Sequence, residues 1–228
     1  MRLRSVTRWS ARCTAGLLLA ALVVAPAAAG PPQAGNRNLD DLLPGWFTWA
    51  LGGHHPDHMG NVQFLPLPNA QPVDDGAGTA DDPATFRGEI NVTLKKKQSF
   101  VLPLIGWTRE VYQDGTTDPF LPDSAFADAR VVLKIDGRTV LDSSRDDLED
   151  FYVDPTDLKH PVIYPEPTPY GTVGTVGFQA IGVVIGPLPV GEHTMTLESE
   201  LRATVADPNH PVNTGAIYQN TWHITVQK

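Results

Sequence analysis

The hydrophobic positions divide the chain into one stretch with helical periodicity and a long series of short apolar runs. Between residues 39 and 51 apolar side chains recur three and four positions apart, which predicts one short amphipathic helix, or two turns divided at Pro44. Beyond residue 60 the apolar runs are short, alternate with polar positions and end at turn-forming residues, which is typical of β-strands. We expect strands near residues 61–67, 85–94, 99–105, 109–112, 129–135, 139–141, 151–153, 173–185, 193–205 and 218–226.

This pattern predicts an all-β protein, an antiparallel β-sandwich of the jelly-roll or immunoglobulin-like kind, with one short N-terminal helix. The 21 prolines and 20 glycines are spread along the chain and disfavour long helices. Asp136-Gly137 lies between two alternating runs and predicts a tight hairpin, because these residues tolerate left-handed backbone. We expect a second hairpin at residues 95–97, where three lysines follow one another.

The first 29 residues have the features of a signal peptide. A basic start precedes an uninterrupted apolar run, and Ala27-Ala28-Ala29 provides a small-residue cleavage site. We therefore expect a secreted protein, extracellular or periplasmic, with a flexible leader at 30–38 and a single domain at 39–228. The one cysteine, Cys13, falls inside the signal peptide, so the mature chain would have no disulfide.

Charge narrows the range of partners. The formal net charge is −9, and it becomes −13 after cleavage because Arg2, Arg4, Arg8 and Arg12 leave with the signal peptide. Such an acidic protein is a poor partner for nucleic acid. No apolar run after the signal peptide approaches the length of about 20 residues that a membrane-spanning helix needs, so we expect no membrane span.

The densest group of candidate metal ligands is His54, His55, Asp57 and His58. Imidazole and carboxylate together suit zinc, copper or nickel. Pro56 prevents a regular helix across the segment, so His54 and His58 need not share a helical face. The alternative interpretation is a polar loop in which one histidine forms a local hydrogen bond.

Two long loops are rich in aspartate, whose hard oxygen atoms suit calcium. Neither loop has the spacing of an EF-hand, and ordinary solvated turns are the alternative interpretation. Calcium is the only cofactor that these residues suggest, and none is certain. The candidate calcium ligands are Asp74, Asp75, Asp81 and Asp82 in the first loop and Asp114, Asp118 and Asp123 in the second.

Four aromatic residues lie at expected strand ends or in the proline-rich loop at 160–171, where a sugar or a peptide could stack on them. They are Trp107, Tyr112, Tyr164 and Tyr170. Trp107 is also a candidate for the core, because large aromatic side chains usually contribute to it.

Several short motifs carry a resemblance to a group of other proteins. They are WFTWAL at 46–51, HPD at 55–57, VQFL at 62–65, FVLPL at 100–104, KIDG at 134–137 and GPLPVGEHT at 186–194. With these motifs the chain resembles a group of uncharacterised secreted bacterial proteins that have an N-terminal Trp-rich helix and a PL-x-x-G-x-H-T sequence before a late strand. The resemblance implies secretion and a β-rich fold, and it implies no activity. Members of the group commonly carry a cysteine pair that is absent here.

Two functions are compatible with these observations. The first is a secreted, non-catalytic binding module for a glycan or a protein partner at the cell surface, stabilised by calcium if the aspartate loops bind it. It rests on strand content, the signal peptide and the absence of a nucleophile motif such as G-x-S-x-G. The alternative is a metal-dependent extracellular enzyme that uses the cluster between His54 and His58.

Overall fold

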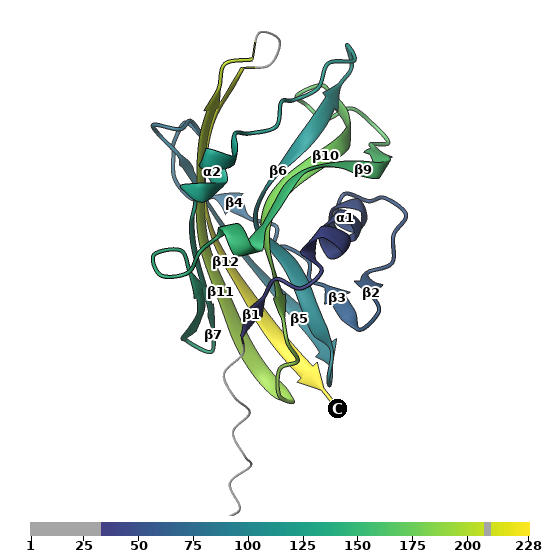
Figure 1. The fold of residues 1–228 in the computed structure, drawn as a ribbon, viewed down its shortest axis with the longest axis vertical. Coiled ribbons are helices and arrows are strands. Elements are labelled where there is room, and N and C mark those ends of the chain that lie inside the picture. Colours follow the sequence, from purple (N-terminus) through teal and green to yellow (C-terminus); the bar gives the residue numbers. More distant parts are fainter. Residues whose placement is uncertain (1–32, 208–210) are drawn as a thin grey trace, which may run out of the picture. The chain divides into compact units, whose positions relative to one another are not determined.

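The computed structural model describes residues 33–207 and 211–228, and it places two β-sheets face to face (Figure 1). The predicted all-β sandwich with a short N-terminal helix is confirmed. The predicted signal peptide and Cys13 lie outside the described residues, so cleavage and secretion stay predictions.

Each sheet has six strands within the described residues. In the first sheet, five strands follow one another in a row, and β9 Tyr152–Ile163 pairs with one of them, β10, outside that row. The order of that row is β1 Ala34–Gly35, β10 Thr172–Ile185, β6 Ser99–Tyr112, β3 Val62–Phe64 and β2 His58–Met59. The order of the second sheet is β4 Gln71–Pro72, β5 Ala84–Lys95, β12 Val212–Gln227, β11 Gly191–Val205, β7 Arg130–Ile135 and β8 Arg138–Asp142.

One pairing in each sheet is parallel, so the sheets are mixed where we expected antiparallel strands throughout. The parallel pairs are β3 with β6 and β5 with β12. The prediction of a hairpin at residues 95–97 is also wrong, because the strands on its two sides belong to different sheets. Lys97 has a left-handed φ of 69°, and the turn carries the chain from β5 in one sheet to β6 in the other.

The main core fills the space between the two sheets. It contains Trp222 from β12, Phe100 from β6 and Ile135 from β7, all fully buried. A second apolar cluster lies on the other face of the first sheet, where helix α1 Leu39–Ala50 packs against β6, β9 and β10. There the ring of Phe47 stacks on that of Phe178 with centroids 4.3 Å apart. The helix is continuous through Pro44.

Several element boundaries differ from the prediction. Ala34 and Gly35 pair with Ile185 and Val184, so the segment expected to be a flexible leader begins to form sheet before residue 39. The two strands expected at 99–105 and 109–112 are one strand, and β9 is far longer than the strand expected at 151–153. A short helix α2 Asp123–Ala127 and a 3-10 turn η1 Glu149–Phe151 were not expected.

In the part of the chain that the structure describes, no helix combines the length and the apolarity that crossing a membrane requires.

The predicted Asp136-Gly137 hairpin is confirmed, with φ values of 52° and 74° at its two central residues. Asp136 also accepts a hydrogen bond from the backbone N–H of Thr194 at 2.9 Å. The imidazole of His193 lies between two acceptors, the Asp136 carboxylate at 2.8 Å and the Pro189 carbonyl at 2.9 Å. Only the doubly protonated ring can donate to both acceptors.

The His193–Asp136 contact predicts a pH-dependent stability. Burial lowers the pKa of His193, but the hydrogen bonds to Asp136 and Pro189 outweigh burial and the net shift is upward. A histidine with a raised pKa adds stability below its unfolded pKa of about 6.5, and this is lost as pH rises through the folded pKa. His193→Gln should therefore lower the melting temperature more at pH 5.5 than at pH 8.5.

The measurement is thermal unfolding of both proteins across that pH range. His223→Gln is the matched control, because His223 is a more exposed histidine 3.1 Å from Glu89 on the outer face of the second sheet. A deficit of His193→Gln that is equal at both pH values would contradict the charged contact.

Candidate functional site

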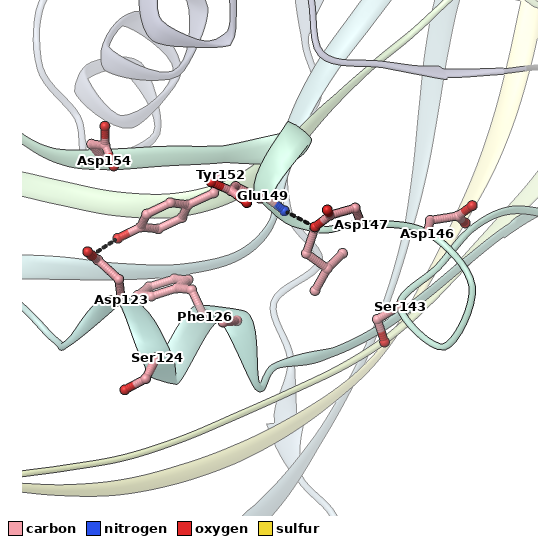
Figure 2. Close-up of a pocket in the computed structure, with 11 residues that line it drawn as sticks. Asp123, Ser124, Phe126, Ser143, Asp146, Asp147, Glu149, Tyr152 and Asp154 are labelled. Atoms are coloured by element: carbon pink, nitrogen blue, oxygen red, sulfur yellow. Dashed lines mark hydrogen bonds between the residues drawn. The ribbon is translucent and has the colours of Figure 1, made fainter.

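A cavity of about 660 Å³ opens between helix α2, the loop that follows β8 and the start of β9 (Figure 2). Five carboxylates line it, and its lining within the described residues includes no lysine, arginine or histidine. We call it the acidic pocket. Its carboxylates are Asp123, Asp146, Asp147, Glu149 and Asp154, and its aromatic residues are Phe126 and Tyr152.

The position of helix α2 depends on one buried glutamine. Gln179 on β10 is fully buried, and its amide both accepts from the N–H of Leu121 at 2.7 Å and donates to the Leu121 carbonyl at 3.0 Å. In the segment 119–122 a proline lies on each side of Phe120-Leu121. Because proline has no backbone N–H, this segment has few hydrogen-bond donors with which to pair with a strand. The glutamine side chain supplies the two hydrogen bonds that a neighbouring strand would otherwise make.

The same glutamine reaches the pocket through Tyr152. Its amide nitrogen donates to the Tyr152 hydroxyl at 3.2 Å, and that hydroxyl donates to Asp123 at 2.9 Å. Figure 2 shows the Tyr152 side chain directed at Asp123, with Phe126 beside its ring. Burial and the Asp123 carboxylate raise the pKa of Tyr152 to about 12, so this residue acts as a neutral donor and an aromatic wall.

The loop on the opposite side of the pocket is held by its own carboxylates. Asp146 accepts from the N–H of Asp142 at 2.7 Å, and Asp147 accepts from the N–H of Glu149 at 3.0 Å. These bonds fold the loop and leave the remaining carboxylate oxygens available for a ligand. Leu148 is buried and anchors the loop to the core.

The carboxylates of the acidic pocket surround a volume rather than a point. In the described residues no three histidine or carboxylate side chains are arranged to hold a metal ion. Separated negative charges around an aromatic wall suit an extended cation, whose several positive groups each meet one carboxylate and whose alkyl parts lie on the rings. A basic peptide segment has this form.

Of the pocket residues, the sequence placed only Asp123 in a candidate site, and that site was a calcium loop. The run Asp146-Asp147-Leu148-Glu149-Asp150 holds four acids in five positions, and this charge pattern was the signal that could have identified the site. Tyr152 gave no such signal, because its role depends on α2, which was not expected.

The structure does not bring the histidine cluster together. His55 packs its ring on Phe64, with centroids 5.4 Å apart, and its Nδ1 lies 2.8 Å from the carbonyl of Pro56. His58 and Asp57 form an exposed pair at 2.9 Å, and the hydrogen bond from His58 lowers the pKa of Asp57. His54 is exposed. This geometry matches the polar-loop interpretation better than a metal centre.

The aspartates of the first loop are exposed, and two of them organise the loop's own backbone. Asp74 accepts from the N–H groups of Gly76 and Thr85, and Asp82 accepts from the N–H of Ala77. The hydrogen bonds from Thr85 and Gly76 lower the pKa of Asp74. Asp75 and Asp81 are exposed as well.

The aspartates of the second loop lie in three different environments. Asp114 accepts from the N–H and the hydroxyl of Thr116 within a tight turn. Asp118 is buried and accepts from the Tyr112 hydroxyl at 2.9 Å. Asp123 belongs to the acidic pocket. The loop therefore does not fold these three carboxylates around one ion.

The four candidate aromatic ligands do not form one platform. Trp107 is partly buried against the main core and donates to the Pro119 carbonyl at 3.0 Å. Tyr164 packs against the helix α1 cluster and shares a hydrogen bond with Thr175. Tyr170, 87% exposed, is the one of the four whose ring lies open to solvent. A flat stacking surface for a sugar is therefore absent among these residues.

Tyr112 and Tyr164 instead lie near Glu110, a carboxylate that the sequence offered without a partner and that was not assigned to a site. Burial raises the pKa of the half-buried Glu110 carboxyl, Thr172 opposes this by a hydrogen bond, and the charge of Asp118 adds to it. Burial, the Asp118 contact and the charge of Glu110 raise the pKa of Tyr112 to about 12. Glu110 is one of 26 acidic residues in the sequence, and no local pattern distinguished it from the others.

No protein family and no curated protein matches the chain. Among solved structures, a cysteine protease inhibitor from Entamoeba histolytica is 14% identical, with 61% of this chain and 87% of that chain covered and a TM-score of 0.22. The solution structure of amebosin is 11% identical, with 61% and 97% covered and the same TM-score of 0.22. At these scores neither similarity supports a conclusion about this protein.

The Gln179 contact predicts a large loss of stability on substitution. Gln179→Leu keeps a similar volume but leaves the buried N–H and C=O of Leu121 without partners, and each unpaired group costs about 1–3 kcal/mol. We expect the free energy of unfolding to fall by about 2–4 kcal/mol in urea titrations. The control is Gln219→Leu, which removes a surface hydrogen bond to Arg87 and should cost about 0.5 kcal/mol or less. Equal losses in the two variants would contradict the role of Gln179.

The arrangement of the aspartate loops predicts no specific response to calcium. We expect millimolar calcium chloride to raise the melting temperature no more than sodium chloride of equal ionic strength, because within the described residues no three of these carboxylates are placed to hold one ion. A calcium site would behave differently. At 100 times its dissociation constant it would add about 2.7 kcal/mol of stability, a shift of several degrees. Such a shift with calcium alone would restore the calcium hypothesis.

Proposed function

We propose that this protein is a secreted, non-catalytic β-sandwich that binds a basic segment of a protein partner at the cell surface. The observation that carries the proposal is the acidic pocket, in which five carboxylates and the Tyr152 ring line one cavity of about 660 Å³ without a basic residue in the lining. The expected net charge of the mature chain adds long-range attraction for such a partner.

The shape of the pocket favours a peptide over a single ion. Carboxylates come from α2, from the loop after β8 and from β9, so a chain of several positive groups can meet them in turn. Exposed ion pairs contribute about 0.2–1 kcal/mol each. Useful affinity therefore requires several pairs at once, which a lysine- or arginine-rich segment provides and a single side chain does not.

The candidate aromatic residues give less support to a glycan. Sugars stack on flat exposed rings, and of the four candidates Tyr170 alone is largely exposed. Of the two partner classes expected from the sequence, a protein is thus the better supported.

The test is the binding of a hexalysine peptide at low ionic strength, measured by calorimetry. Neutralising three pocket acids with Asp146→Asn, Asp147→Asn and Asp154→Asn should weaken binding about tenfold or more, since several ion pairs are lost while the asparagines can still accept the backbone hydrogen bonds. Affinity should also fall steeply as salt is raised to about 0.15 M.

A second triple variant with the same change in net charge is the control. Asp75→Asn, Asp81→Asn and Glu166→Gln lie at exposed positions outside the pocket lining, and they should weaken binding about twofold or less. Equal losses in the two triple variants would show that net charge alone attracts the peptide. That result, or no binding by the wild-type protein, would overturn the proposed function.

A further inference from the structure

A second cavity, of about 170 Å³, lies at the edge of the sandwich between helix α1, the segment at 65–70, β6 and the inner face of the second sheet. Its lining is mostly apolar and includes Trp46, Ile105 and Leu197. We call it the apolar pocket. It shares no lining residue with the acidic pocket, so it does not depend on the function proposed above.

One buried polar side chain in this lining has an atom without a partner. Asn220 is 5% exposed, and its Oδ1 accepts no hydrogen bond. It alternates along β12 with the buried Trp222 and Ile224, which places its side chain on the inner face of the sheet. A buried acceptor without a donor costs about 1–3 kcal/mol, so the position calls for a donor that enters the pocket.

A second unpartnered polar atom lies next to it. Ser199 on β11 is 1% exposed, and its hydroxyl also lacks a partner. Ser199 pairs with Tyr218 while Asn220 pairs with Leu197, so Ser199 and Asn220 are diagonal neighbours on one face of the sheet. Ser199 does not line the cavity, so a ligand in the pocket meets Asn220 alone and has to donate a hydrogen bond to its Oδ1, which a hydroxyl group does and a carbonyl does not.

The walls of the pocket are held rigidly. The indole of Trp46 on α1 donates to the carbonyl of Leu65 at 2.8 Å, and the indole of Trp222 on β12 donates to the carbonyl of Pro66 at 2.7 Å. Pro68 lies directly over Gly88 of β5, where a Cβ would come within 2.6 Å of the proline Cβ. The segment at 65–70 is thus fixed from both sides, and the pocket is formed before a ligand arrives.

The mouth of the pocket is open and apolar. Leu67 is 41% exposed and Tyr218 is 37% exposed, and both line the cavity. The Tyr218 ring is held by stacking on Phe86, with centroids 5.3 Å apart. Large apolar side chains exposed together at one opening are typical of a binding site.

From these observations we infer that the apolar pocket binds a small aromatic ring that carries a hydroxyl group, with the ring among the apolar walls and the hydroxyl donating to Asn220. The size agrees, because a cavity of roughly 150 Å³ accepts benzene. The same chemistry occurs in a free phenol and in the tyrosine side chain of a partner protein.

The test is titration of the isotopically labelled full-length protein with phenol, followed by the amide signals of residues around the pocket. A seven-atom ligand should bind with a dissociation constant on the order of 1 mM. Toluene is the matched ligand without a hydroxyl, and it should bind about five- to tenfold more weakly, which corresponds to one hydrogen bond. This comparison needs no variant and is therefore independent of any folding defect.

Two variants assign the contact. Asn220→Leu should bind phenol and toluene equally and should be at least as stable as the wild type, because it removes an unpaired buried acceptor. Ala70→Phe, which places a ring in the cavity, should abolish binding of both. Thr221→Val changes the adjacent position on the opposite face of β12 and should leave binding unchanged.

Each outcome decides the inference. Saturable signal changes at the pocket with phenol favoured over toluene support it. An N-acetyl tyrosine amide that binds as phenol does would identify a partner's tyrosine as the source, and binding of phenol alone would identify a free small molecule. No saturable binding would show that the pocket takes no aromatic ring, and equal binding of phenol and toluene to the wild type would show that Asn220 does not select a hydroxyl group; either result would overturn the inference.

Discussion

The Gln179 amide is the contact on which the arrangement of the two sheets around the acidic pocket depends. The chain leaves the first sheet after β6 and must reach β7 in the second, and on the way Leu121 becomes buried. Buried backbone groups need partners, and Gln179 supplies both of them from β10. Helix α2 then begins at Asp123, directly beside Tyr152, so a buried amide in the sheet determines where the Asp123 carboxylate lies at the pocket.

The strands were largely predictable because their period-two pattern follows from one buried and one polar face. The hairpin at Asp136-Gly137 was predictable because its turn is local. The length of β9 was not predictable, because it contains Pro155 and Pro161 and proline usually argues against a strand. Among the described strands β9 pairs with β10 alone and is an edge strand. Both prolines fall outside its paired positions, where a missing N–H costs little.

The candidate site was much less predictable than the fold. The pocket residues come from separate segments of the chain, and Gln179 contacts two of these segments through Leu121 and Tyr152. Gln179 lies 58 positions from Leu121, and no local spacing encodes such a contact. The histidine cluster failed for the opposite reason. Its residues are adjacent in the sequence, but the His55 ring packs on Phe64 while His58 pairs with Asp57. The side chains therefore do not converge on one point.

The parallel pairing of β5 with β12 has a consequence for how the protein is made. β12 lies between β5 and β11, and Arg87 on β5 bonds to Gln219, 132 positions later. The entropy cost of closing so long a loop comes before the contact can stabilise the protein, and such long-range pairing slows folding. The second sheet cannot be completed before β12 is in place, and until then the edge of β5 that β12 covers has no partner strand among the described residues. While the protein folds, this unpaired strand edge is accessible to chaperones and to other chains.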